Sequence, residues 1–355
     1  MTATVATRNV GGLLGRGVVW AAIAWLVLVF PLGRPGFEVQ RFSQAVAYAI
    51  VALSLNVLLG YVGQISLGHQ AFVGFGAFAS AYLVTAQGQS FWVGVIGAAA
   101  IGGAQALVLG GVSLRIRGLY FALVTLSYGL VAEQNIFQIQ ELTGGGQGQA
   151  APKPAGFDTD WRYYYLCLAF LALVLWIDSR MMKSKGGRAL LALRENPRVA
   201  ATFGINVRMF TLFAFVVSGA FAGLGGALIA HNNTFVSPEV WSFNLALVFV
   251  IMTVVGGLRS RPGVVLGGAF FALMPYLVDK LGFLERALAA IPAPNDLTPE
   301  LAPLVLGPLL LLLTLIVTPG GIGQQIRPLQ GWLLGGRFDL HAQGPKDVQI
   351  TDVRA

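Results

Sequence analysis

The sequence predicts an all-α protein, a polytopic bundle of about ten transmembrane helices with both termini on the cytosolic side. Three observations support this prediction. Only 11% of the 355 residues are charged and 56% are hydrophobic, whereas about a quarter of a soluble chain is usually charged. Apolar runs long enough to cross a bilayer recur along the chain, and the mean hydropathy is +0.72. Lys and Arg residues concentrate in every second connection between these runs.

The apolar runs are separated by polar residues or by Gly and Pro, and they define the expected spans. These lie at residues 17–33, 42–61, 63–86, 91–113, 118–140, 161–178, 209–231, 240–258, 262–281 and 301–317. An even number of spans places both termini on one side of the membrane. Residues 1–16 then form a cytosolic segment, residues 17–320 the transmembrane domain and residues 321–355 a polar, loosely ordered cytosolic tail.

The distribution of positive charge selects the orientation. With the N-terminus in the cytosol, 17 of the 23 Lys and Arg residues fall in inside segments. The remaining six are Arg34, Arg41, Lys153, Arg162, Lys280 and Arg286. This excess follows the positive-inside rule. The net charge of +8 is therefore explained by topology, and we expect no nucleic-acid partner.

Cysteine and histidine usage argues against a metal or disulfide framework. Cys167 is the single cysteine and lies in an apolar run, so we expect a small buried hydrophobic side chain. His69, His231 and His341 lie in three separate segments without the spacing of a zinc site. We expect no metal site and no cofactor in this chain.

The third expected span opens with the polar, glycine-rich stretch Gly63 to Gln70. Polar side chains at this density cost several kcal/mol against lipid, so the stretch must face protein or a water-filled path, with partial unwinding expected. Two interpretations remain open for His69, a hydrogen bond that sets helix packing and a place along a path through the membrane. Gln64 and Ser66 belong to the same candidate path.

Two further polar groups lie near the outer ends of expected spans. Glu133 and Asn135 lie in the fifth span, and a carboxylate there is either functional or paired with a polar group on another helix. In the eighth span we expect Trp241 to anchor the chain at the membrane interface and Asn244 to act at a gate.

The longest inside loop, residues 179–208, carries signals for two short helices outside the membrane. The stretch Arg188–Glu195 is a good helix former, Asn196 can cap a second helix, Pro197 fits the first helical position and Gly204 suits the residue after its end. The alternative is a solvated basic connector with incidental helicity.

Part of this loop, GRALLALRENPRVAATFGINV, resembles the cytosolic coupling loop of ABC importer permeases, specifically branched-chain amino acid permeases of the LivM/LivH type. Three further regions resemble the same family in the same order, and together the similarity covers about residues 42–320. These regions are Asn56–Leu83, Gly118–Leu130 with Leu142–Gly148, and Phe215–Gly268. Two departures, Gln147 before Gly148 and the stretch Leu130–Glu133, bear on substrate identity.

The resemblance implies a permease subunit of an ABC importer in the cytoplasmic membrane of a prokaryote. It would move branched-chain or related hydrophobic amino acids by alternating access, and it would not be an enzyme. The implied partners are an identical or paralogous permease, two cytosolic ATPase subunits that bind ATP and Mg²⁺, an extracytoplasmic solute-binding protein and membrane lipid.

The resemblance also assigns residues to roles. The positions that match the ATPase-coupling motif are Arg188, Leu190, Leu193, Glu195, Ala200, Ala201 and Gly204. The expected translocation path contains Gln64, Ser66, His69, Glu133, Asn135 and Asn244.

Two loops are expected outside the membrane on the other side. Residues 141–160 contain LTGGGQ, which resembles the nucleotide signature of ABC ATPases, but the chain has no Gly-Lys pair for a phosphate-binding loop. We expect Thr143, Gly144 and Gly145 to act as a flexible gate or a contact for the binding protein. Residues 282–300 are expected to carry a short surface helix.

Three alternatives remain open. One is a self-sufficient secondary transporter or channel for a small polar solute, which normally needs ion sites or a filter. Another is an importer for urea or short amides. The third is an intramembrane enzyme, for which His69 and Glu133 are the obvious pair. Dependence of uptake on separate ATPases distinguishes the importer from the secondary transporter.

Overall fold

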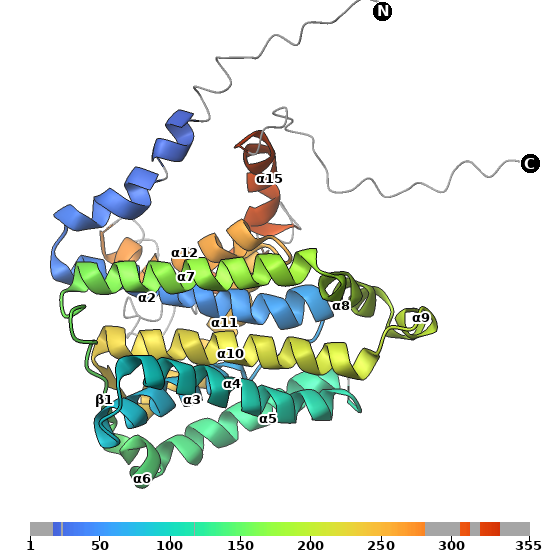
Figure 1. Cartoon of the computed structure of the whole chain (residues 1–355), viewed down its shortest axis with the longest axis horizontal. Coiled ribbons are helices and arrows are strands. Elements are labelled where there is room, and N and C mark those ends of the chain that lie inside the picture. The colour runs from blue at the N-terminus through green and yellow to red at the C-terminus, as the bar shows by residue number, and fades with distance from the viewer. Residues whose placement is uncertain (1–16, 23, 117, 281–305, 313–319, 334–355) are drawn as a thin grey trace, which may run out of the picture.

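The computed structural model describes residues 17–22, 24–116, 118–280, 306–312 and 320–333, and this part of the chain is almost entirely helical (Figure 1). The longer helices are α2 (Gly36–Leu55), α4 (Phe91–Ser113), α7 (Asp160–Lys183), α10 (Val207–Asn233) and α12 (Arg261–Lys280). The shorter ones are α3 (His69–Ala81), α5 (Leu119–Gln134), α6 (Gln140–Thr143), α8 (Lys185–Glu195), α9 (Pro197–Thr202), α11 (Phe243–Gly256) and α15 (Gly321–Leu333). Residues 306–312 are also helical.

Short elements connect or extend these helices. Wider π-helical turns form η1 (Trp25–Val29), η3 (Asn56–Val62) and η4 (Tyr82–Ala86), and 3₁₀ turns form η2 (Phe30–Gly33), η5 (Ile136–Gln138), η6 (Gly145–Gln147) and η7 (Pro238–Trp241). Two strands of two residues, β1 (Gln149–Ala150) and β2 (Phe235–Val236), pair antiparallel. The all-α prediction is therefore confirmed for the described residues.

Four of the described helical segments are long and apolar enough to cross a membrane. They span residues 36–62, 91–113, 160–183 and 207–233, and shorter apolar helices include residues 243–256 and 261–277. The predicted span 91–113 coincides with α4, and those at 42–61 and 209–231 fall within observed helices. The total of about ten spans and the side of the termini stay predictions.

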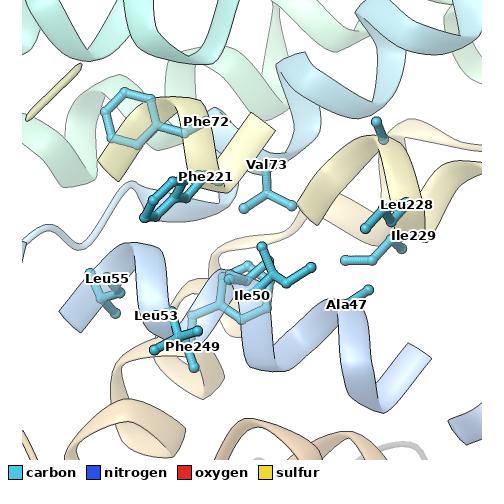
Figure 2. Close-up of a cluster of buried hydrophobic side chains, with 14 of the residues drawn as sticks. Ala47, Ile50, Leu53, Leu55, Phe72, Val73, Phe221, Leu228, Ile229 and Phe249 are labelled. Atoms are coloured by element: carbon cyan, nitrogen blue, oxygen red, sulfur yellow. The ribbon is translucent and has the colours of Figure 1, made fainter. Parts of the chain in front are cut away.

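Helix α2 lies at the centre of the bundle because its sequence from Ala45 onward is apolar on nearly every face. Its most hydrophobic window is entirely buried inside the protein. Figure 2 shows Ala47, Ile50, Leu53 and Leu55 of α2 in a cluster with Phe72 and Val73 of α3, Phe221, Leu228 and Ile229 of α10 and Phe249 of α11.

Small residues allow the helices around α2 to approach closely, as the sequence predicts for Gly219 and Gly223. A Cβ added at either glycine of α10 would meet the α4 backbone, at Gly102 for Gly219 and at Ala98 for Gly223. Close backbone approach of this kind allows van der Waals packing between helices. In lipid this packing matters because no hydrophobic effect drives the helices together there. The prediction of small-residue packing is confirmed at these positions.

The bundle has two ends with different elements. The α8 end is formed by α8, α9, the end of η3 and the turn at residues 257–260. The β end is formed by β1, β2 and η7. Figure 1 shows α8 and α9 at one end of α7 and α10, and β1 at the other.

Three expectations have different outcomes. Cys167 is fully buried and free, as predicted. The tail is not loosely ordered throughout, because α15 forms and packs on α11 and α12; its Gly323 closely approaches Ser260 in the 257–260 turn. The expected surface helix at 282–300 lies outside the described residues.

Candidate functional site

The two helices predicted for the long loop are present, and local sequence explains both. The Asn196 side chain accepts hydrogen bonds from the backbone N–H groups of Arg198 at 3.0 Å and Val199 at 3.3 Å, which caps α9. Pro197 occupies the first helical position. Gly204 follows the end of α9 with φ of +78°, and its N–H donates to Ala201 O at 3.0 Å. The two-helix prediction is confirmed, with α8 starting at Lys185.

Burial divides the seven predicted coupling residues into two groups. Leu190, Leu193 and Ala200 are 0%, 3% and 2% exposed. They therefore hold α8 and α9 on the rest of the protein and present no surface to a partner. The other four, Arg188, Glu195, Ala201 and Gly204, are exposed. Contact between these four and an ATPase stays a prediction.

The α9 surface also exposes apolar side chains that the sequence analysis did not single out. Val199 is 49% exposed and Phe203 80% exposed. Arg198 of α9 and Arg208 in the first turn of α10 are also exposed. Exposed apolar side chains in a basic loop are suited to a protein partner.

The C-terminal end of α8 is fixed by contacts far apart in the sequence. Arg194 donates to the backbone oxygen of Gly60. Arg259 donates from its guanidinium to Glu195 Oε1 at 2.7 Å and from its backbone N–H to Asn56 Oδ1 at 2.9 Å. The bond from Arg259 lowers the pKa of the exposed Glu195 carboxyl. Asn56 and Arg259 were not among the residues predicted from the sequence, because 203 residues separate the two partners.

A buried ion pair joins three elements near the same end. Asp178 of α7 is 1% exposed, and its carboxylate accepts from Arg261 of α12 and from the hydroxyl of Tyr61 in η3 at 3.1 Å. A carboxylate near the end of the apolar run 161–178 is a sequence signal for such an ion pair, but the run does not reveal which residue is its partner.

The third span is broken, as the sequence suggests. Residues 63–68 are not helical, and α3 begins only at His69. His69 is fully buried; its Nε2 lies 2.6 Å from Ser54 Oγ. The Leu67 N–H donates to Thr125 Oγ1 of α5 at 3.0 Å. Gly63 and Ile65 are exposed, whereas the part of the stretch from Ser66 onward is largely buried and faces protein. The packing interpretation of His69 has a partner, and the path interpretation stays a prediction.

Several polar atoms of this break have no hydrogen-bond partner among the described residues. They are Gln64 Oε1, Ser66 Oγ, His69 Nδ1 and both side-chain amide atoms of Gln70. Gln64 also lines a cavity of about 20 Å³ together with Leu193 of α8 and Thr211 of α10. Of the predicted path residues, Gln64 therefore lies next to α8, while Ser66 and His69 lie farther along the same stretch.

The other three predicted path residues lie elsewhere. Glu133 accepts from the Phe243 N–H at 3.0 Å and so caps the N-terminus of α11. Asn135 and Asn244 are exposed, at the end of α5 and in the first turn of α11. Glu133 therefore has a partner on another helix, and a role of Glu133, Asn135 or Asn244 in the path stays a prediction. The structure does not bring Glu133 together with His69.

The interfacial prediction for Trp241 is wrong, because its ring is 1% exposed. It packs against α3 where Gly74 leaves room, since a Cβ at Gly74 would lie 3.1 Å from the indole ring. Trp241 lies near the end of a predicted span, but its side chain is buried by contacts with other helices, which the span alone does not specify.

The expected gate loop is folded and tied to the β end. Thr143 is 3% exposed, with its Oγ1 2.8 Å from the backbone oxygens of Phe137 and Ile139. Gly144 and Gly145 adopt positive φ angles of 76° and 57°, which glycine tolerates. A gate or binding-protein contact at these residues stays a prediction.

His231, which the sequence analysis did not assign, fastens this loop. Its Nδ1 lies 2.7 Å from Pro152 O, so this nitrogen carries the hydrogen because a carbonyl only accepts. Its Nε2 then accepts from Ser80 Oγ at 2.9 Å. The ring joins α10, α3 and the segment just after β1.

Comparison with known proteins decides the family. The model of the family described as "branched-chain amino acid transport system / permease component" matches residues 39–314. The chain belongs to this permease family. It is therefore a multi-pass membrane protein of a transport family. No solved structure matches the chain.

Three relatives of this chain are each named as a transport permease protein. It is 31% identical over 273 residues to the high-affinity branched-chain amino acid transport system permease protein LivM of Escherichia coli K12, covering 69% of this chain and 63% of LivM. It is 25% identical over 252 residues to LivH of the same organism, covering 64% and 80%. It is also 25% identical over 277 residues to the L-arabinose ABC transporter permease protein AraH of Azospirillum brasilense, covering 70% and 76%.

Proposed function

We propose that this chain is a permease subunit of an ABC importer that moves branched-chain or related hydrophobic amino acids across the cytoplasmic membrane of a prokaryote. ATP is hydrolysed on two separate ATPase subunits, and a second permease, identical or paralogous, completes the pathway. An extracytoplasmic solute-binding protein delivers the substrate at the β end. The relatives named as permease components support this assignment.

The single observation that carries the proposal is the pair α8 and α9. Their inner side is buried through Leu190 and Leu193, whereas α9 exposes Phe203 and Val199 with Arg188 on the same loop. A helix pair fixed on one side and apolar on the other transmits a rigid-body movement of a docked partner. The cavity shared by Leu193 and Gln64 places the broken span directly beside this pair.

Co-purification from detergent tests the docking. The Phe203→Asp variant places a charge at the centre of the exposed α9 surface and should lose the two ATPase subunits that wild type retains. Phe203 is 80% exposed, so the variant should still fold. Leu142→Asp is the matched control, because Leu142 is 51% exposed at the β end, and it should keep the ATPases.

Uptake by proteoliposomes tests the transport cycle. With binding protein and ATPase subunits present, leucine, isoleucine and valine should accumulate only when ATP is supplied on the side of the membrane where the ATPase subunits lie. L-Arabinose belongs in the same panel, because AraH is named for it. Uptake without ATPase subunits would instead support the secondary transporter, and arabinose uptake alone would contradict the amino acid assignment.

A further inference from the structure

Helix α3 starts inside the bundle, which gives it an N-terminus away from the surface. Its first residue, His69, contacts Ser54. Along the helix axis, Ser54 lies roughly 10 Å from Val62, where η3 ends at the α8 end of the bundle. The first N–H groups of a helix lack partners within it and carry partial positive charge. In many transporters the N-termini of interrupted helices face anionic groups of the substrate.

The backbone donors at this N-terminus are unused in the described part of the chain. Neither the His69 N–H nor the Gln70 N–H donates a hydrogen bond there, while the next N–H, from Ala71, already bonds Gly68 O at 3.1 Å. The two free donors are adjacent in the first turn. Adjacent N–H groups at a helix start are the usual means of holding a carboxylate or phosphate.

The unpartnered side chains of the same turn are a second, independent observation. Ser66, His69 and Gln70 are 1%, 0% and 0% exposed, yet Ser66 Oγ, His69 Nδ1 and both Gln70 amide atoms have no partner within the described residues. Burial of a polar group without a hydrogen-bond partner is unfavourable, so these atoms are suited to a ligand that supplies one. A hydroxyl, an amide N–H₂ and an imidazole can all donate to a carboxylate oxygen.

The ring of His69 can adjust to such a ligand. The Ser54 hydroxyl has one hydrogen and two acceptors in reach, Val51 O at 2.7 Å and His69 Nε2 at 2.6 Å. When this hydrogen bonds the ring, Nδ1 carries the imidazole hydrogen and becomes a donor. No Lys, Arg, Asp or Glu occurs in residues 63–70, so the turn offers dipoles and no formal charge.

An apolar surface adjoins this polar turn. The His69 and Phe72 rings meet edge to face at 5.5 Å, and an aromatic row continues from there between α3, α5 and η5. Its members are Phe72, Phe75 and Phe78 of α3, Tyr128 of α5 and Phe137 of η5. Ring centroids in contact lie between 5.0 and 6.3 Å apart. Polar donors next to an aromatic row match an α-amino acid with an apolar side chain.

We propose that the first turn of α3 and the preceding break bind the carboxylate of the transported amino acid, with the aromatic row facing its side chain. This inference rests on the proposed function and names the contact for the substrate. Helix α5 covers the turn: a Cβ at Gly129 would lie 2.5 Å from Gln70 Nε2. The side of α5 that packs on the bundle is narrow. Its buried residues are Phe121, Ala122, Thr125, Gly129 and Ala132. Separation of α5 from α3 opens the turn to substrate.

Cysteine labelling tests the site in the full transporter. Ser66→Cys is combined with Cys167→Ser, reconstituted with its partner subunits, and alkylated with N-ethylmaleimide in each nucleotide state. Leucine at about ten times its half-protecting concentration should slow the reaction about tenfold, whereas leucinamide, which lacks the carboxylate, should not. Ser43→Cys is the control, because Ser43 is equally buried but bonded to Val39 O at 3.1 Å, and it should stay unreactive. Failure of Ser66→Cys to react in any state, or equal protection by leucinamide, overturns the proposal.

Substitution of Gln70 separates binding from packing. Gln70→Leu should raise the KM for leucine while ATPase co-purification stays normal, and Gln70→Glu should lower uptake by about tenfold or more through charge repulsion. Normal uptake by Gln70→Leu means that Gln70 only fills space and contradicts the site. Wild-type uptake is measured in the same vesicles. If wild type takes up no branched-chain amino acid, the proposed function fails; if uptake is normal and leucine gives no protection, only the carboxylate site fails.

Discussion

Arg259 has a left-handed backbone, with φ of +67°, at a position where glycine would be free of strain. Such a conformation persists only where the surroundings hold it. Here Asn56 accepts the Arg259 backbone N–H, and Glu195 accepts its guanidinium. One residue therefore connects the end of α2, the turn before α12 and helix α8. We interpret Arg259 as a positioning residue for α8.

The two carboxylates at this end should differ in their effect on stability. Asp178→Asn removes the charge from a side chain that is 1% exposed, and breaking a buried pair costs about 3–5 kcal/mol. Glu195→Gln makes the same change at a side chain that is 73% exposed, where water replaces the lost partner. Thermal unfolding in detergent should show a clear loss for Asp178→Asn and little change for Glu195→Gln. Equal losses would contradict the assigned burial.

The residue scale also shows where sequence reasoning reaches its limit. The caps at Asn196 and Gly204 were predictable because their partners lie within three residues. Glu133 was assignable only to two alternatives, since its partner Phe243 lies 110 residues away. A carboxylate in a span reveals the need for a partner, but the fold determines which one it finds.

At the scale of helices, the contact between α4 and α10 depends on glycine at defined positions. Gly223→Ala would push a methyl group against the Ala98 carbonyl and should destabilise the protein by about 1–3 kcal/mol. Gly111→Ala changes the partner helix α4 at a position with nothing within 4 Å of the new methyl, so it should be neutral or stabilise by up to about 1 kcal/mol. Thermal unfolding of both variants measures the difference. A similar loss at Gly111, where the new methyl group meets no neighbour, would contradict the packing explanation for Gly223.

The loop at the β end should detach when its histidine is changed. His231→Phe keeps a ring against Phe91 but removes both hydrogen bonds, to Pro152 and Ser80. Hydrogen exchange of the Ala151 amide, which bonds Thr234 O, should then accelerate by about tenfold or more.

Thr85→Val is the control for this loop. It removes a hydroxyl bond to Ala150 O at 2.7 Å from an exposed position, where water can replace it, so exchange at Ala151 should change little. Equal acceleration in the two variants would mean that His231 is not the main attachment.

At the scale of the whole molecule, the pattern of apolar runs predicted the helices well because each run is a local property. The bounds of α4 coincide with the prediction, and α10 extends it by two residues at each end. The expectation of loose order was wrong for residues 321–333, because α15 packs through small residues such as Gly323 onto a distant turn, and composition alone indicated only a polar tail. The location of the candidate carboxylate site depends on contacts between α3 and α5, which no single segment specifies.

The orientation of the bundle follows from charge and can be tested as a property of the whole molecule. Phe203 and Leu142 are exposed at opposite ends of the bundle, by 80% and 51%, and the buried Cys167 provides a silent background. A membrane-impermeant maleimide should label Leu142→Cys in intact spheroplasts and Phe203→Cys only after permeabilisation, because the basic loop around α8 and α9 lies inside. Labelling of both cysteines from one side would mean that residues 142 and 203 lie on the same side of the membrane. A reversed pattern would place α8 and α9 outside, where no cytosolic ATPase can reach them, and would contradict both the orientation and the proposed function.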